Sequence, residues 1–194
     1  MDTWTRGSVR LFLAINLSSA SRRAIHAATR PLRDVAPSLA WVREPLLHLT
    51  LKFLGEQTDD RLHAIGTCLA AVAARHAELV MELGGLGAFP NFRRARTVWF
   101  GITPQPRLEL LHHDIETGFG DLGFEVEGRP FRPHLTLARV KSPDEDLMRV
   151  LSREAAKVDY REEVVVRSVD LMKSDLTAMG SHYTMLTSAS LRSS

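Results

Sequence analysis

The sequence predicts an α+β fold made of two related halves, and two observations support this prediction. The tetrapeptide His-Leu-Thr-Leu occurs twice, at residues 48–51 and again at residues 134–137. Around both copies, short β-rich apolar runs alternate with segments of helical periodicity, and no linker is long enough to divide separate folding units. We therefore expect residues 1–194 to form one two-lobed domain with pseudo-twofold repetition, in which each lobe supplies one strand that begins with the tetrapeptide.

The first half of the chain carries clear start and stop signals. Ser18 and Ser19 offer an N-cap for a first helix, Pro37 ends that helix, and Gly55 closes the first motif strand. Thr58, followed by two aspartates, caps a second helix. The expected elements are strands at 9–17, 39–42 and 48–54 and helices at about 20–35 and 58–78.

The second half repeats the alternation of strands and helices. Pro106 begins a helix, Gly123 ends it, and Pro130 and Pro133 frame the approach to the second motif strand. A Ser-Pro-Asp-Glu sequence that begins at Ser142 initiates the last helix. The expected elements are strands at 80–86, 97–102, 124–127, 134–140, 164–174 and 182–188 and helices at about 106–122 and 142–158.

Composition excludes several classes of protein. The chain is 44% hydrophobic and 25% charged, which is ordinary for a globular protein, and no apolar run approaches the roughly 20 residues of a membrane span. The net charge of +2 is too small for a protein that coats nucleic acid nonspecifically through its positive charge. The N-terminus lacks a secretory apolar region, and Cys68 stands alone, so we expect a cytoplasmic protein without disulfides.

The repeated tetrapeptide places two kinds of reactive group on one face of each strand. Successive side chains of a strand point to opposite faces, so His48 projects with Thr50, and His134 projects with Thr136. The intervening leucines face the other way, into a core. An imidazole and a hydroxyl from each half of a duplicated scaffold suit the chemistry of a phosphodiester.

Arginines gather near the second motif, and their orientation is open. Arg93, Arg94 and Arg96 form one cluster, which is either solvated loop charge or a phosphate contact. Arg139 lies five residues after His134, and strict alternation would place it on the opposite face of the strand. Only a bulge or a strand end would turn Arg139 toward the histidine.

Other histidines fit the pattern less well. His182 begins a third His-x-Thr sequence, but Met185 replaces the final leucine, and we leave His182 out of the site. His112 and His113 lie in the middle of a helix, where adjacent residues do not share a face. We therefore predict no metal site.

The motif segments HLTLKFLG and FRPHLTLARV resemble the paired motifs of the two-histidine phosphoesterase superfamily. They are most similar to its LigT-like branch, the RNA 2',3'-cyclic phosphodiesterases, also called 2'-5' RNA ligases. The opening VRLFLAINL, the middle RTVWFG and the closing LMKS, with Gly180 and Tyr183, extend the resemblance over essentially the whole chain. The resemblance implies a bilobal fold in which two antiparallel sheets line a central cleft and helices cover the outer faces.

The resemblance also implies a mechanism and its residues. His48 would donate a proton to the leaving 3'-oxygen, and His134 would accept one from water, which leaves a 2'-phosphate end. Histidine suits both roles because its ordinary pKa is near 6.5, and the hydroxyls of Thr50 and Thr136 would stabilise charge on the phosphate oxygens. The two nearly identical motifs do not by themselves decide which histidine is the acid. The scheme needs neither a metal nor another cofactor.

Three further residues are substrate-binding candidates. Arg139 resembles an arginine that is frequent in the second motif strand of the family and would contact the phosphate. Phe131 and Tyr183 would stack on a base or close the cleft, and for both residues core packing stays an equal alternative. The expected partners are RNA ends with a 2',3'-cyclic phosphate or a 5'-hydroxyl, bound by a monomer with no obligate protein partner and no membrane.

Three rival functions remain open at the level of sequence. A related two-histidine enzyme would act on another cyclic nucleotide or on a 2'-5' oligonucleotide. A binding module would keep the cleft without turnover, although a binder has no need of two proton-transfer groups. A metal-dependent hydrolase is disfavoured because the sequence lacks ligand spacing.

Overall fold

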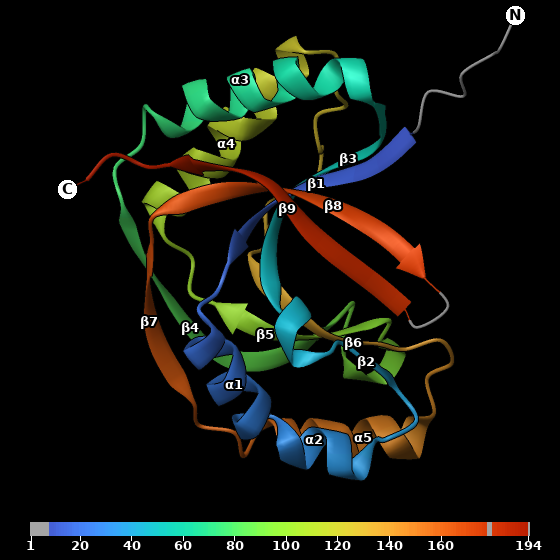
Figure 1. Ribbon diagram of the computed structural model, residues 1–194. Coiled ribbons are helices and arrows are strands. Elements are labelled where there is room, and N and C mark those ends of the chain that lie inside the picture. Colours follow the sequence, from blue (N-terminus) through green and yellow to red (C-terminus); the bar gives the residue numbers. More distant parts are fainter. Residues whose placement is uncertain (1–7, 178–179, 194) are drawn as a thin grey trace, which may run out of the picture.

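Nine strands form a single curled antiparallel sheet in the computed structural model, which describes residues 8–177 and 180–193 (Figure 1). The strand order is β7-β4-β5-β6-β3-β1-β8-β9, and β2 pairs with β6 beside this path. The strands are β1 (Ser8–Asn16), β2 (Ala40–Trp41), β3 (His48–Thr58), β4 (Leu79–Phe89), β5 (Thr97–Ile102), β6 (His134–Arg139), β7 (Arg161–Val166), β8 (Ser168–Thr177) and β9 (Gly180–Ser190). The α-helices are α1 (Ser19–Ala28), α2 (Arg30–Val35), α3 (Leu62–Ala73), α4 (Pro106–Asp121) and α5 (Glu145–Ala155). Short 3-10 turns are η1 (Glu44–Leu46), η2 (Asp59–Arg61) and η3 (Phe92–Arg94).

The sheet divides into two halves that meet between β3 and β6. The His48 half contains β3, β1, β8 and β9, and the His134 half contains β6, β5, β4 and β7. Within the part of the chain that the structure describes, the two halves pair in register at one position, Leu49 with Leu135. The two sheets that the family resemblance implies therefore correspond to two halves, which this one pair joins into a continuous sheet.

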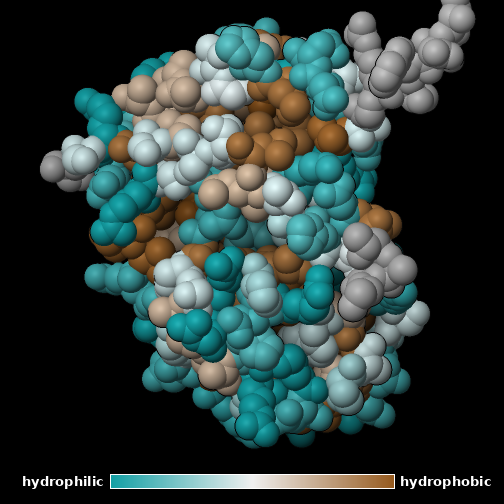
Figure 2. Space-filling view, viewed as in Figure 1, coloured by the Kyte–Doolittle hydropathy of each residue, from teal (hydrophilic) through white to brown (hydrophobic). Residues whose placement is uncertain are grey.

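Helices cover the two halves on opposite sides of the molecule. Figure 1 shows α3 and α4 packed beside each other at one end and α2 and α5 packed beside each other at the other end. The first pair buries Leu69 and Ile115 in a core that also contains Leu49 and Leu135. The second pair packs around Ala138. Figure 2 shows mostly hydrophilic residues over α2 and α5, as expected for helices that turn their apolar faces inward.

The first predicted helix is interrupted, which corrects the expected single segment. The chain forms α1 and then α2, and Thr29 lies between them as the C-cap of one and the N-cap of the next. Pro31, at the start of α2, has no N–H to donate to the preceding turn and its ring crowds that turn, which disfavours a continuous helix, and the chain breaks at Thr29. Gly55 was also expected to end the first motif strand, but it adopts a positive φ of 68° at an irregularity, and β3 continues to Thr58.

In place of the single strand expected at 164–174, the chain forms two strands that belong to different halves of the sheet. β7 pairs with β4 in the His134 half, whereas β8 pairs with β1 in the His48 half. The break falls at Arg167, between the two strands. Val166 is buried before the break and Val169 and Leu171 are buried after it, so the alternation of buried residues changes phase at Arg167. Both segments are rich in valine and other strand-forming residues, which is why strand propensity alone predicted one strand.

Two further elements also differ from those expected from the sequence. The helix expected to run to about residue 78 ends at Ala73, and the strand expected at 124–127 does not form. Among the described residues, no helix is both long and apolar enough to cross a membrane.

Candidate active site

Both motif strands begin with their histidine and lie next to each other in the sheet. Leu49 and Leu135 are 1% and 0% exposed and face the core, so the alternation of each strand sends the histidines and threonines to the other face. His48, Thr50, His134 and Thr136 are all partly exposed there. The structure thus brings together the four residues that the sequence singled out.

The two imidazoles are held by the same kind of hydrogen bond. Nδ1 of His48 lies 2.7 Å from the carbonyl oxygen of Leu46, and Nδ1 of His134 lies 2.7 Å from the carbonyl oxygen of Arg132. A carbonyl oxygen only accepts, so Nδ1 carries the hydrogen in both rings, and Nε2 remains for chemistry. In the neutral His48 ring, Nε2 accepts from the Thr50 hydroxyl at 3.0 Å.

Burial lowers the pKa of both histidines below the ordinary value of 6.5. For His48, desolvation is the main cause, the bond to the Leu46 carbonyl opposes it, and the positive charge of Arg22 adds to it. For His134, desolvation is again the main cause, the Arg132 carbonyl opposes it, and Arg139 adds to it. Both rings are therefore mostly neutral at pH 7 in the absence of an anionic substrate.

Aromatic side chains flank each histidine on its own half of the sheet. His48 has Tyr183 edge-on at 5.3 Å between ring centroids and Phe12 at 5.0 Å. His134 has Phe89 edge-on at 4.9 Å and Trp99 at 6.5 Å. The sequence alone did not indicate a site role for Phe12, Phe89 or Trp99, because an aromatic residue in a strand is more often part of the core.

Trp99 depends on a glycine in the neighbouring strand. The Trp99 ring lies so close over Gly87 that a Cβ at this position would be 2.2 Å from the ring. A side chain here would displace the indole from the wall beside His134. The backbone of β4 therefore helps to shape the site.

Arg139 reaches the histidine face because of a β-bulge. Val98 pairs with Ala138 whereas Trp99 pairs with Thr136, so one extra residue of β6, Leu137, lies between them. Leu137 and Ala138 are both buried, and alternation resumes with Arg139 on the face of Thr136. Nη1 of Arg139 donates to the Thr97 hydroxyl at 2.9 Å.

Tyr183 and Phe131, the two aromatic candidates, lie in different surroundings. Tyr183 contacts His48 and Phe12, beside the motif face. Phe131 stacks on His112 of α4, with centroids 3.9 Å apart and an interplanar angle of 10°, and packs against the core. Of the two environments, that of Tyr183 suits contact with a substrate, and that of Phe131 suits packing.

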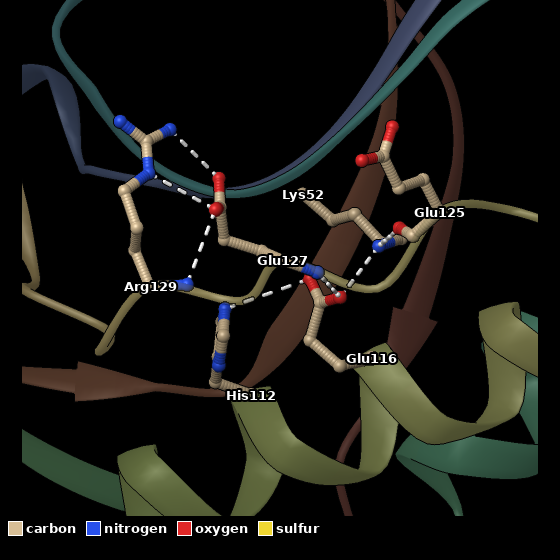
Figure 3. A network of polar contacts seen from close by, with 6 residues as sticks. All are labelled: Lys52, His112, Glu116, Glu125, Glu127 and Arg129. Carbon is tan, nitrogen blue, oxygen red and sulfur yellow. Dashed lines mark hydrogen bonds and ion pairs between the residues drawn. The ribbon is translucent and has the colours of Figure 1, made fainter.

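A buried ion pair anchors the segment that leads to His134 (Figure 3). Lys52, four residues after His48 in β3, donates to Glu116 at 2.6 Å and to the carbonyl of Glu125 at 2.7 Å. The other backbone bond runs from the N–H of Glu127 to Glu116 at 2.9 Å. These side chains satisfy backbone groups that a strand ladder would otherwise bond, which explains why residues 124–127 form no strand.

The remaining sequence candidates lie elsewhere. Arg93, Arg94 and Arg96 are exposed in and after η3, and His182 is exposed on β9. Burial raises the pKa of the Cys68 thiol, which does not favour a thiolate nucleophile. Within the described ranges, no three His, Cys, Asp or Glu side chains group as a metal site.

Comparison with known proteins places this arrangement in a family. Residues 18–178 match the model of the 2'-5' RNA ligase superfamily, and the chain belongs to this superfamily. A relative from Methanothermobacter thermautotrophicus, named RNA 2',3'-cyclic phosphodiesterase, is 31% identical over 91% of this chain and 95% of its own length. A relative of the same name from Geobacillus stearothermophilus is 34% identical over 66% of this chain, but the match spans only 41% of that protein.

A solved structure has the same fold. The crystal structure of E. coli LigT complexed with 3'-AMP is 25% identical, with a TM-score of 0.75 over 95% of this chain and 99% of that chain. The bilobal α+β fold expected from the sequence is therefore confirmed.

Proposed function

We propose that the protein is an RNA 2',3'-cyclic phosphodiesterase that opens the cyclic phosphate at an RNA end to a 2'-phosphate. The observation that carries this proposal is the pair of motif histidines. Both rings are fixed through Nδ1 by a backbone carbonyl, both leave Nε2 available, and both lie on one face of adjoining strands. In-line opening of a diester needs a base on one side of phosphorus and an acid on the other, and two such imidazoles fit this requirement. The names of the relatives support the substrate.

In the proposed reaction, Nε2 of His134 takes a proton from water as the water oxygen attacks phosphorus. The bond from phosphorus to the 3'-oxygen breaks, and the protonated Nε2 of His48 gives its proton to that oxygen. The electron pair of the broken bond stays on the 3'-oxygen, and the 2'-oxygen keeps the phosphate. The direction of transfer follows the family resemblance, since the two rings are held alike.

Thr50, Thr136 and Arg139 would stabilise the charge that grows on the non-bridging oxygens. The hydroxyl of Thr50 donates to neutral His48 at 3.0 Å. Once Nε2 of His48 is protonated it no longer accepts, so this hydroxyl is released to donate to the phosphate. Arg139, turned to the same face by the bulge, adds a fixed positive charge. Tyr183 would contact the nucleotide beside His48, whereas the stacking of Phe131 on His112 favours its role in core packing.

In the reverse direction, the 5'-hydroxyl of a second RNA would replace water and form a 2'-5' linkage. His134 would then deprotonate this hydroxyl. We propose that a cytoplasmic monomer of one two-lobed domain carries out both reactions on RNA ends, without a metal or a protein partner.

One experiment tests the reaction class, the metal and the regiochemistry together. A defined oligoribonucleotide with a 2',3'-cyclic phosphate is incubated with the protein in excess chelator, and the product is analysed to find which hydroxyl keeps the phosphate. A 2'-phosphate is expected. A 3'-phosphate, or turnover that chelator abolishes, would overturn the mechanism, and binding without any turnover would favour the rival binding module.

A further inference from the structure

A cavity of about 450 Å³ lies beside His48, over strands of the His48 half. Its lining includes His48 of β3, Asn16 of β1, Asp170 and Met172 of β8, and Met185 of β9. Asn16 pairs directly with His48, and Asp170 lies one strand further from it. Since strands lie about 4.8 Å apart, the cavity extends roughly 10 Å sideways from the strand that carries His48.

A buried carboxylate lies in the lining of this cavity. Asp170 is 5% exposed. One carboxylate oxygen accepts from the hydroxyls of Ser188 at 2.5 Å and Ser168 at 3.1 Å, and the other accepts from the side-chain amide of Asn16 at 2.7 Å. A carboxylate has about four acceptor positions, and these bonds use three of them. Asp170 therefore retains the capacity to accept one hydrogen bond from a ligand.

The other walls of the cavity suit a flat ring. The thioethers of Met172 and Met185 offer polarizable surfaces, and Tyr183 adds an aromatic one. Arg22 contributes a guanidinium, one nitrogen of which donates to the carbonyl of Pro45 at 2.9 Å. The cavity thus combines apolar faces with a buried carboxylate acceptor and a cationic donor, which suits a nucleobase.

The direction of the reaction decides which nucleoside would reach the cavity. This step rests on the proposed function. His48 protonates the departing 3'-oxygen, which belongs to the ribose that carries the cyclic phosphate, so this ribose lies on the His48 side of phosphorus. Water, or the 5'-hydroxyl of a second RNA, approaches from the His134 side.

We infer that the cavity holds the base of the terminal nucleotide and that Asp170 accepts a hydrogen bond from its exocyclic amino group. Adenine, cytosine and guanine carry such a group, whereas uracil does not. The single N–H on the pairing edge of uracil lies between two carbonyl oxygens, which a carboxylate repels. Every base offers an acceptor to Arg22, so the amino group is the distinguishing feature, and the enzyme discriminates against terminal uridine.

Steady-state kinetics with small substrates test this inference. The four nucleoside 2',3'-cyclic phosphates are compared with the cyclic phosphate of 1-O-methylribose, which has no base. The expected kcat/KM is about tenfold higher for the three amino-bearing bases than for uridine, mainly through KM. Asp170→Asn should reduce this difference to within threefold and leave the baseless substrate unaffected. Asp175→Asn, a matched change further along β8 at a side chain paired with Lys173, should keep the wild-type pattern.

Equal kcat/KM for all four bases in the wild-type protein would overturn the inference while leaving the proposed function intact. Lack of turnover of any cyclic phosphate would instead overturn the proposed function. A discrimination pattern that persists in folded Asp170→Asn would also remove Asp170 from base recognition.

Methyl NMR of the wild-type protein gives a second test that needs no variant. Adenosine 2'-phosphate should shift the methyl resonances of Met172 and Met185, which line the cavity, and inorganic phosphate should not. Met81 and Met148, which lie in the two apolar cores, serve as internal controls. Unshifted Met172 and Met185 at saturating nucleotide would place the base elsewhere and overturn the inference.

Discussion

Leu49 pairs with Leu135 across the boundary between β3 and β6, so equivalent residues of the two tetrapeptide copies lie opposite each other. Two antiparallel strands that pair through equivalent residues are related by a local twofold axis at that pair. The same axis relates His48 to His134 and brings both to one face. The repeated tetrapeptide thereby places two imidazoles symmetrically on one face of the sheet.

Removal of either imidazole should abolish most of the turnover. We expect His48→Ala and His134→Ala each to lower kcat about 10²–10⁴-fold, because one proton transfer is lost in each variant. Hydrolysis of a cyclic-phosphate oligonucleotide measures the effect. His182→Ala, at an exposed histidine of β9, is the matched control and should retain wild-type rates. Near-normal turnover in both active-site variants would discard the two-histidine mechanism.

The threonine hydroxyls should matter more for kcat than for KM. Thr50→Val and Thr136→Val keep the β-branched shape but remove the donor to the developing charge. We expect each to lower kcat about 10²-fold, in line with the loss of one preplaced donor. Unchanged kcat in both variants would restrict these residues to a structural role.

The pH dependence should reflect the lowered pKa of both histidines. Activity requires one neutral and one protonated ring, so kcat/KM follows a bell centred between the two pKa values. Because desolvation lowers both pKa values below 6.5, the maximum of kcat/KM should lie on the acid side of pH 6.5. Bound phosphate favours the protonated ring, so the optimum of kcat should be higher. A kcat/KM maximum above pH 6.5 would contradict this prediction.

Arg139 should influence both binding and the ionisation of His134. Its positive charge lowers the pKa of His134, so Arg139→Ala should raise that pKa and move the acid limb of the kcat/KM profile to higher pH. We also expect kcat/KM to fall about 10-fold or more, since hydrogen bonds to a charged group contribute roughly 1.5–3 kcal/mol. Arg94→Ala, at an exposed arginine of η3, should change neither property. If the acid limb of the kcat/KM profile does not move in Arg139→Ala, the proposed proximity of Arg139 to His134 is excluded.

The Lys52–Glu116 pair should be needed for both stability and positioning. The two side chains are 4% and 7% exposed, so Lys52→Met leaves a buried carboxylate without its lysine cation and should cost about 3–5 kcal/mol in the free energy of unfolding. The double variant Lys52→Met with Glu116→Gln should recover part of this loss. Its kcat should stay low because Lys52 no longer holds the carbonyl of Glu125 in the segment that leads to His134.

Urea unfolding and kcat, measured on the same samples, separate these two effects. Lys157→Met, at an exposed lysine paired with Glu154, is the matched control. Wild-type kcat in a stable double variant would mean that the network stabilises the fold without positioning His134.

Local sequence patterns were sufficient to predict most of the helices and strands. The strand at 97–102 was predicted with its observed bounds, and the helix that begins at Pro106 ends one residue before the expected position. These predictions succeed because alternation, capping and proline placement act over a few neighbouring residues. The same reasoning identified His48, Thr50, His134 and Thr136 as members of one face in each strand.

Only the tertiary structure decided which residues meet across the site. Arg139 shares the histidine face because a bulge forms against β5, and Asp170 reaches the cavity beside His48 because β8 pairs with β1. The break at Arg167 and the unformed strand at 124–127 likewise depend on partners far away in the chain. The alternation of apolar and polar residues indicates which face of its own strand a side chain occupies. Which residues lie beside it on neighbouring strands depends on strand-pairing energies summed over both halves of the sheet.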